Sequence, residues 1–256
     1  MRARFVPLLL CLAAAAPMPD DLADGGSARV VAVVDGDTVR LDDGRELRLV
    51  GIQAPKLPLD RPNFRAWPVA QTAKERLEAL AGGRRVHLGY GGRRLDRYGR
   101  VLAHLVTEGG VWLQGEMLRL GLARVYSFAD NRALVPEMLA QERRARAATR
   151  GIWAHPYYAI IDQAKAGDAT GHFALVEGWV IDAAVVRGRG YLNFGPDWRT
   201  DFTVTVAPAD MRLFRREDIH LASYEGRRVR VRGWLRSFNG PMIEVTHPEA
   251  IEVLEE

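Results

Sequence analysis

The sequence predicts a mainly β protein with helices (α+β), arranged as two modules along 256 residues. Three observations predict this class. Residues 29–52 alternate apolar and polar side chains on both sides of the turn sequence Asp42-Asp43-Gly44, which is typical of a β-hairpin. Helical periodicity then alternates with short apolar runs as far as residue 153. Beyond residue 171, short strands return at even spacing, separated by turns rich in glycine and asparagine.

The first module contains five predicted strands and three predicted helices. Strands are expected at residues 29–41, 46–52, 84–90, 101–106 and 121–126. Helices are expected at residues 69–81, 111–120 and 132–150. Five strands with helices between them, a glycine-rich hairpin and a charged loop on one face predict an OB-type five-stranded barrel with three helices at residues 29–155.

The second module has a β pattern of its own. Strands are expected at residues 173–184, 191–194, 201–206, 227–235 and 242–246. They predict a second small OB-like β-barrel at residues 171–256, with a linker at residues 156–170.

Arginine dominates the basic side chains. Of the 36 lysines and arginines, only Lys56, Lys74 and Lys165 are lysines, which leaves 33 arginines. Guanidinium groups match the geometry of phosphate, so this bias is what a phosphate-binding surface would show. Alanine and glycine are abundant as well, and the base composition of the genome explains all three equally well. Both explanations stay open.

The first residues predict an export signal at residues 1–16. Arg2 and Arg4 precede a short apolar run at residues 6–16, and Ala13-Ala14-Ala15 supplies small residues for cleavage. The expected location is therefore periplasmic or secreted. Cleavage would remove Cys11, the only cysteine, and would lower the formal net charge from +4 to +2 by removing two arginines. No other segment predicts a membrane span.

Residues 35–56 hold the polar chemistry of the first module. Asp35 and Asp37 flank Gly36 at the start of the hairpin, and Arg48 lies on its returning strand. The corner Gln53-Ala54-Pro55-Lys56 follows. We expect the hairpin to bring Asp37, Arg48 and this corner to one point, which is an arrangement suited to phosphodiester chemistry.

Several motifs here resemble the staphylococcal (thermo)nuclease family over roughly residues 29–153. They are VDGDTVRL, RLVGI followed by AP, DRYGRVLAHL, GLARVY and an arginine-rich helix that ends in GIW. The resemblance implies an OB-type barrel and calcium-assisted hydrolysis of DNA or RNA. It implies that Asp37 is a metal carboxylate, with Asp35 beside it, and that Arg48 and Arg100 are the catalytic arginines.

The corner departs from the family pattern. Where the family has Asp-Thr-Pro-Glu or Asp-Ala-Pro-Glu, this chain has Gln53-Ala54-Pro55-Lys56. Gln53 still offers a neutral oxygen to calcium, but Lys56 replaces the glutamate that activates water. We expect Lys56 to pair with Asp37 or Asp35 and to weaken metal binding. The corner therefore argues against assuming calcium-dependent hydrolysis.

Three interpretations stay open. The protein is a calcium-dependent endonuclease with a base from elsewhere, such as Asp60 or Asp96; or it is a binding protein for nucleic acid or other phosphodiesters; or it is a non-catalytic extracytoplasmic scaffold. The binding interpretation relies on Arg48 and Arg100 and on four further side chains, which are Arg93, Arg94, Arg97 and Tyr126. The plain structural alternative is that Arg48 and Arg100 only form ion pairs with Asp37 and Asp96, and that Asp35 and Asp37 only form a turn.

In the second module, cations alternate with aromatic residues around Arg187 and Arg189. This pattern is typical of a stacking platform for single-stranded DNA or RNA, and also of a barrel with solvated arginines. No small-molecule cofactor is expected, and the pattern predicts no particular oligomeric state.

Overall fold

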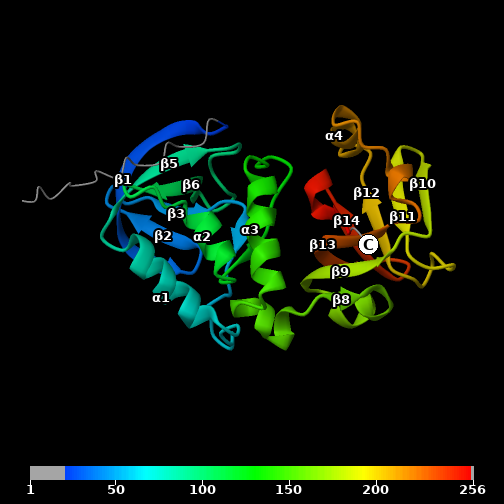
Figure 1. Cartoon of the computed structure of the whole chain (residues 1–256), viewed down its shortest axis with the longest axis horizontal. Coiled ribbons are helices and arrows are strands. Elements are labelled where there is room, and N and C mark those ends of the chain that lie inside the picture. The colour runs from blue at the N-terminus through cyan, green and yellow to red at the C-terminus, as the bar shows by residue number, and fades with distance from the viewer. Residues whose placement is uncertain (1–20, 255–256) are drawn as a thin grey trace, which may run out of the picture.

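The computed structural model describes residues 21–254, so the export signal predicted at residues 1–16 lies outside the described residues. Within this part, five strands of the N-terminal module form a closed barrel in the order β1-β2-β3-β6-β5. The strands are β1 (Ala23–Asp35), β2 (Thr38–Leu41), β3 (Glu46–Leu49), β5 (Arg85–Tyr90) and β6 (Val101–Thr107). The predicted α+β class and OB-type five-stranded barrel are confirmed (Figure 1).

Three α-helices accompany the barrel, as predicted. They are α1 (Ala70–Ala81), α2 (Leu113–Arg119) and α3 (Val135–Ala147). Each presents buried apolar side chains, and Leu77, Met117 and Met138 join the barrel residues in one hydrophobic core. Burial of this apolar surface is the main force that holds the helices on the barrel.

The membership of the barrel differs from the prediction in two places. The segment at residues 29–41 is two strands, because the chain reverses at Gly36 and pairs Asp35 with Thr38. A β-carbon at Gly36 would lie 2.7 Å from that of Ala54 and 2.8 Å from that of Ala73, so the turn packs too closely for any other residue. The segment at residues 121–126 is not a barrel strand. Its β7 (Arg124–Val125) pairs with β4 (Ile52–Gln53) in a separate two-stranded sheet.

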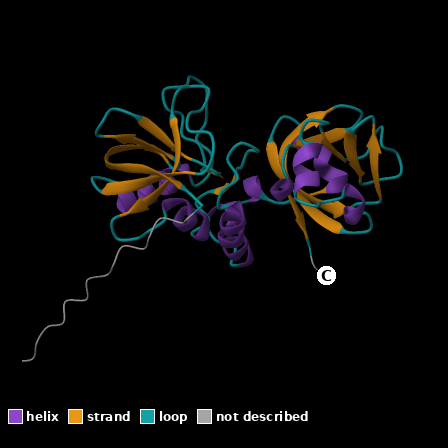
Figure 2. Ribbon diagram, turned by 90° about the horizontal axis from the view of Figure 1, so that it is seen from above, coloured by secondary structure: helices purple, strands orange, loops and turns teal. Residues whose placement is uncertain are grey.

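The second module, here called the C-terminal β module, is one eight-stranded sheet around its own hydrophobic core (Figure 2). The sheet runs from β10 at one edge to β8 at the other. Its strands are β8 (Ile161–Asp162), β9 (Phe173–Trp179), β10 (Asp182–Val186), β11 (Arg189–Asn193), β12 (Thr203–Val206), β13 (Arg228–Ser237), β14 (Pro241–Val245) and β15 (Ile251–Val253). The helix α4 (Met211–Arg216) packs Met211 and Phe214 into the core.

The linker predicted at residues 156–170 is ordered structure instead. Strand β8 pairs in parallel with β9, and the 3-10 helix η3 (Gln163–Ala169) buries Ala166 in the C-terminal core. The C-terminal sheet therefore begins about ten residues before the predicted boundary at residue 171. The sequence pattern missed β8 because a strand of two residues shows no alternation.

The two modules meet through buried ion pairs. Arg232 of β13 reaches across to Glu142 of α3, with Nη2 at 3.0 Å from Oε1. Glu142 also binds Arg146, which in turn binds Glu252 of β15. At a second point Arg132 binds Glu249. In Figure 1, α3 lies between the barrel and the C-terminal β module.

Among residues 21–254, no helix is long and apolar enough to cross a membrane.

Candidate nucleic-acid interface

Asp37 lies at the centre of the candidate site and is fully buried in the turn between β1 and β2. Its Oδ1 accepts hydrogen bonds from Arg48 Nη1 at 2.9 Å and from Thr38 Oγ1 at 3.1 Å. Its Oδ2 accepts from the backbone N–H of Ala54 at 2.8 Å. The register that pairs Thr38 with Arg48 places this arginine beside Asp37. The hairpin thus gathers Asp37, Arg48 and the corner at one point, as predicted.

Lys56 closes the site. Its Nζ lies 2.7 Å from both carboxylate oxygens of Asp37 and 3.2 Å from Asp35 Oδ2. The side chain of Lys56 is 17% exposed, so the ammonium group faces the carboxylates under little solvent screening. Two carboxylates and two cations, Arg48 and Lys56, therefore balance each other formally.

The two carboxyl groups respond to this environment in opposite directions. Burial raises the pKa of Asp37, but the charges of Arg48 and Lys56 outweigh burial and hold that pKa well below its usual range. Burial, with the nearby charge of Asp37, raises the pKa of Asp35 despite the presence of Lys56. Asp37 is thus the carboxylate that the cations stabilise in its charged form.

Gln53 is held by a residue of the neighbouring strand. Its Oε1 accepts hydrogen bonds from Arg124 Nε at 3.0 Å and from Arg124 Nη2 at 2.7 Å. The pairing of β4 with β7 sets Gln53 directly opposite Arg124. Burial lowers the pKa of Arg124 to about 10, yet leaves it a cation at neutral pH. The amide oxygen that we expected to face calcium is bound to this guanidinium group.

These residues do not fit a calcium ion. Calcium takes six to eight oxygen ligands, usually with several carboxylates among them. Here Lys56 already occupies both oxygens of Asp37, and Arg124 occupies the oxygen of Gln53. In residues 21–254, no cluster of three or more His, Cys, Asp or Glu side chains is arranged to hold a metal ion.

A cavity of about 540 Å³ opens over Arg48 and Lys56. Of the predicted site residues, it brings together Arg48, Gln53, Lys56, Arg93, Arg97, Arg100 and Tyr126. Asp96 also lines the cavity and accepts hydrogen bonds from Arg100, with Nε at 2.8 Å from Oδ2. The arginines come from β3 and from the loop between β5 and β6, so sequence-distant segments supply one basic surface.

Three predicted nucleic-acid residues do not line this cavity. The guanidinium group of Arg94 lies 4.6 Å from the ring centre of Tyr90. Arg187 lies in the turn between β10 and β11, and Arg189 binds Glu244 at 2.8 Å in the C-terminal β module. In contrast, Trp234 of β13 lines the cavity although the sequence pattern did not indicate it. Only the packing of the two modules brings Trp234 there, so no local pattern would have revealed it.

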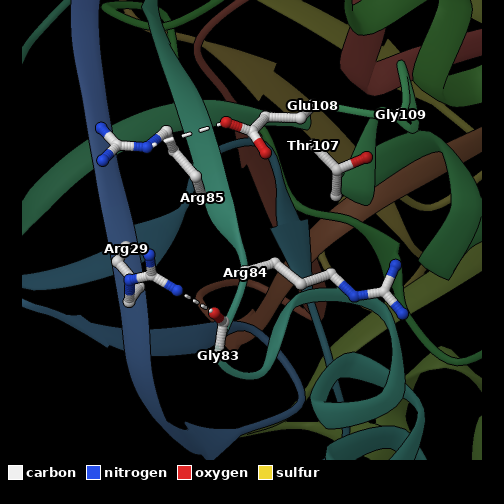
Figure 3. A pocket seen from close by; sticks show the side chains of 7 residues that line it. All are labelled: Arg29, Gly83, Arg84, Arg85, Thr107, Glu108 and Gly109. Atoms are coloured by element: carbon white, nitrogen blue, oxygen red, sulfur yellow. Dashed lines mark hydrogen bonds and ion pairs between the residues drawn. The ribbon is translucent and has the colours of Figure 1, made fainter.

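A second basic hollow lies elsewhere on the barrel and shares no lining residue with the first. Figure 3 shows Arg29, Arg84 and Arg85 around it, with Arg85 facing Glu108 and Arg29 donating to the carbonyl of Gly83 at 2.8 Å. None of the described residues that line this hollow is aromatic, so they offer phosphate contacts but no surface for a base.

The sequence of this chain is similar to those of known proteins. Residues 46–155 match the family described as staphylococcal nuclease homologue. An "Uncharacterized endonuclease" of Escherichia coli is 30% identical over 153 residues, which is 59% of this chain and 89% of the relative. "Endonuclease YncB" of Bacillus subtilis (strain 168) is 28% identical over 130 residues, which is 49% of this chain and 60% of the relative. The chain belongs to the staphylococcal nuclease homologue family.

Proposed function

We propose that this protein binds nucleic acid through the Arg48 cavity and does not hydrolyse it by calcium-dependent chemistry. The observation that carries the proposal is the position of Lys56, whose Nζ bridges both oxygens of Asp37 and also reaches Asp35. In an ordinary calcium site these oxygens would face the metal. In this chain they are already neutralised by an internal cation.

The charge of Lys56 also supports the proposal that calcium does not bind at Asp37. Two unit charges of the same sign at 4 Å repel each other by about 4 kcal/mol near a protein surface, and a divalent ion would be repelled more strongly. Calcium would therefore have to displace the ammonium group of Lys56 before it could reach Asp37. The corner offers no replacement, since Gln53 is bound to Arg124 and the other two residues, Ala54 and Pro55, carry no side-chain oxygen.

The same cavity retains what phosphate binding requires. Arg93 and Arg97 are exposed at its rim, and Tyr126 and Tyr98 line it beside them. Arginine forks pair with phosphate oxygens, and aromatic rings accept bases by stacking. A single strand of DNA or RNA offers both groups, so it is the ligand that this lining favours.

Hydrolysis with a relocated base is the second candidate, and the geometry gives it less support. Asp96 lines the cavity but is engaged by Arg100, and hydrogen bonds from Arg100 outweigh burial and lower its pKa. Asp60 is exposed in the loop after the corner and does not line the cavity. Neither carboxylate is poised to take a proton from water beside Arg48.

The proposal includes export to the periplasm or the medium. It rests on the charged and apolar pattern of residues 1–16 alone.

The experiment combines binding and cleavage measurements on single-stranded DNA and RNA, each with calcium and with a chelator. We expect binding that weakens steeply with salt, and intact strands in both conditions. Calcium-dependent cleavage that Arg48→Ala abolishes would overturn the proposal. Absence of both binding and cleavage would favour the scaffold interpretation instead.

A variant of the corner provides a positive control. The triple change Gln53→Asp, Ala54→Thr and Lys56→Glu restores the oxygen side chains that the family pattern has at these positions. If the restored protein cleaves DNA with calcium while the unmodified protein does not, the corner is the cause of the lost reaction. Circular dichroism of both proteins checks that they are equally folded.

A further inference from the structure

Trp234 of the C-terminal β module forms part of the wall of the N-terminal cavity. It lines the same cavity as Arg48 and Arg97, and 45% of its surface is exposed. Its Nε1 donates a hydrogen bond to the hydroxyl oxygen of Tyr126 at 2.9 Å. The cavity over the basic cluster is therefore built by both modules.

The position of Trp234 is fixed by the residue two places before it. Side chains at i and i+2 of a strand point to the same face, so Arg232 and Trp234 leave β13 on one side. Arg232 is buried, and its guanidinium group binds Glu142 and the carbonyl of Val125 in the N-terminal module. This buried contact anchors β13, and the next side chain on that face is held against Tyr126.

Trp234 belongs to a cluster of aromatic rings where the two modules meet. The ring centres of Phe173 and Trp234 lie 6.4 Å apart, those of Tyr126 and Phe173 4.8 Å, and those of Tyr126 and Phe128 5.0 Å. Phe128 is 49% exposed, so one more ring of this cluster faces solvent. A hollow of about 210 Å³ shares Tyr126, Phe128 and Trp234 with the cavity and extends onto Arg236 of β13.

We propose that Trp234 stacks on an unpaired base of a nucleic-acid strand whose phosphates lie on the arginines of the cavity. The inference rests on the proposed function, because it assumes that a strand binds there. It assigns the C-terminal β module a direct part in binding. Stacking needs a base whose face is free, and this is met in a single strand but not in an intact duplex.

The test compares oligothymidylate with an abasic strand of the same length and backbone. Binding is measured by fluorescence anisotropy of labelled strands at one fixed salt concentration. Trp234→Ala should weaken binding of oligothymidylate about tenfold and leave binding of the abasic strand unchanged. Trp234→Phe keeps an aromatic face and should recover most of the affinity.

Trp179 supplies the matched control. It is 46% exposed on β9 of the same module and lines neither the cavity nor the adjoining hollow. Trp179→Ala should therefore bind both strands as the unmodified protein does. Unchanged binding of the abasic strand by Trp234→Ala also shows that the variant is folded.

Two results would overturn the inference. If Trp234→Ala binds oligothymidylate normally, or loses affinity equally for both strands, no base stacks on this residue, while the proposed function stands. If the unmodified protein binds neither strand in this assay, the proposed function and this inference fail together.

Discussion

Lys56 Nζ lies 2.7 Å from each carboxylate oxygen of Asp37, at the corner where the family pattern has a glutamate. The ammonium group of Lys56 is a cation supplied by the chain itself. Its side chain is mostly buried, and the hydrogen bonds that it donates hold it in place. Asp37 is therefore stabilised as an anion without any metal. Lys56, which we propose takes the place of calcium, is at the same time part of what holds the turn between β1 and β2.

Lys56→Glu should make the stability of the protein depend on calcium. The change leaves three carboxylates with Arg48 as their remaining cation, and breaking a buried ion pair costs about 3–5 kcal/mol. In a chelator the Tm should fall by several degrees, and calcium should recover part of the loss because it binds the folded state. Thermal unfolding with and without calcium measures both effects.

The control for this prediction is Lys165→Glu, which makes the same charge change at an exposed lysine of the C-terminal β module. Its Tm should be independent of calcium, as should that of the unmodified protein. A saturable rise in Tm of the unmodified protein with calcium would contradict our assignment of Lys56 as a substitute for the metal.

His104 should make the protein less stable in mild acid. Burial lowers the pKa of this core histidine to about 4, whereas an unfolded chain has a histidine pKa near 6.5. Between these values the unfolded state binds the extra proton, so stability is lost as the pH falls from about 6.5 towards 4. His104 should account for about 2 kcal/mol of the loss between pH 7 and pH 5, measured by urea unfolding at each pH, and His247 should add to the loss because burial lowers its pKa to about 4 as well.

His104→Gln should make this dependence shallower, because glutamine has no proton to take up in this range, while His247 keeps its own contribution. The comparison uses the slope of stability against pH, so a general loss of stability in the variant does not affect it. His220→Gln, at an exposed histidine, serves as the control and should keep the full slope. An unchanged slope in His104→Gln would show that other groups cause the acid sensitivity.

Arg232→Met should uncouple the two modules. It removes one of the two buried cations that bind Glu142 and Glu252, the other being Arg146, and breaking such buried ion pairs costs about 3–5 kcal/mol. We expect the unmodified protein to unfold in one transition and the variant in two, since each module has its own core. Calorimetry separates these cases.

Arg228→Met is the matched control on the same strand. Arg228 is more exposed and binds Glu177 within its own module, so its loss should leave one transition. If Arg232→Met also unfolds in one transition at a similar temperature, the buried ion pairs do not couple the modules.

Local patterns predicted the centre of the site because its parts lie on one hairpin. The register between β2 and β3 sets Thr38 opposite Arg48, and the signs of the charges were enough to predict that Lys56 binds Asp37. The rest depended on contacts between distant segments. Gln53 and Arg124 are 71 residues apart, and Tyr126 and Trp234 are 108 residues apart. Alternation within a strand shows which residues share a face, but not which other segment covers that face.

The pattern around Arg187 and Arg189 also shows that a local sequence pattern does not reveal which residues the fold brings together. Cations that alternate with aromatic residues predict a binding platform, yet the fold places Arg189 against Glu244 and leaves both arginines outside the cavity. Arg93 and Arg97 lie at the cavity instead, in a loop that also holds Tyr98. Sequence proximity to aromatic residues therefore did not distinguish arginines at the cavity from arginines outside it.

Arg93→Ala and Arg187→Ala test this distinction directly. Arg93 should contact phosphate, so its loss should weaken binding of all single strands to the same extent and reduce the dependence of log K on log salt by about one. Its partner Asp130 is 3.7 Å away and 53% exposed, so it does not hold Arg93 away from a strand. Arg187→Ala removes the same charge outside the cavity and should leave the slope unchanged. A larger effect of Arg187 than of Arg93 would move the nucleic-acid interface from the Arg48 cavity to the C-terminal β module.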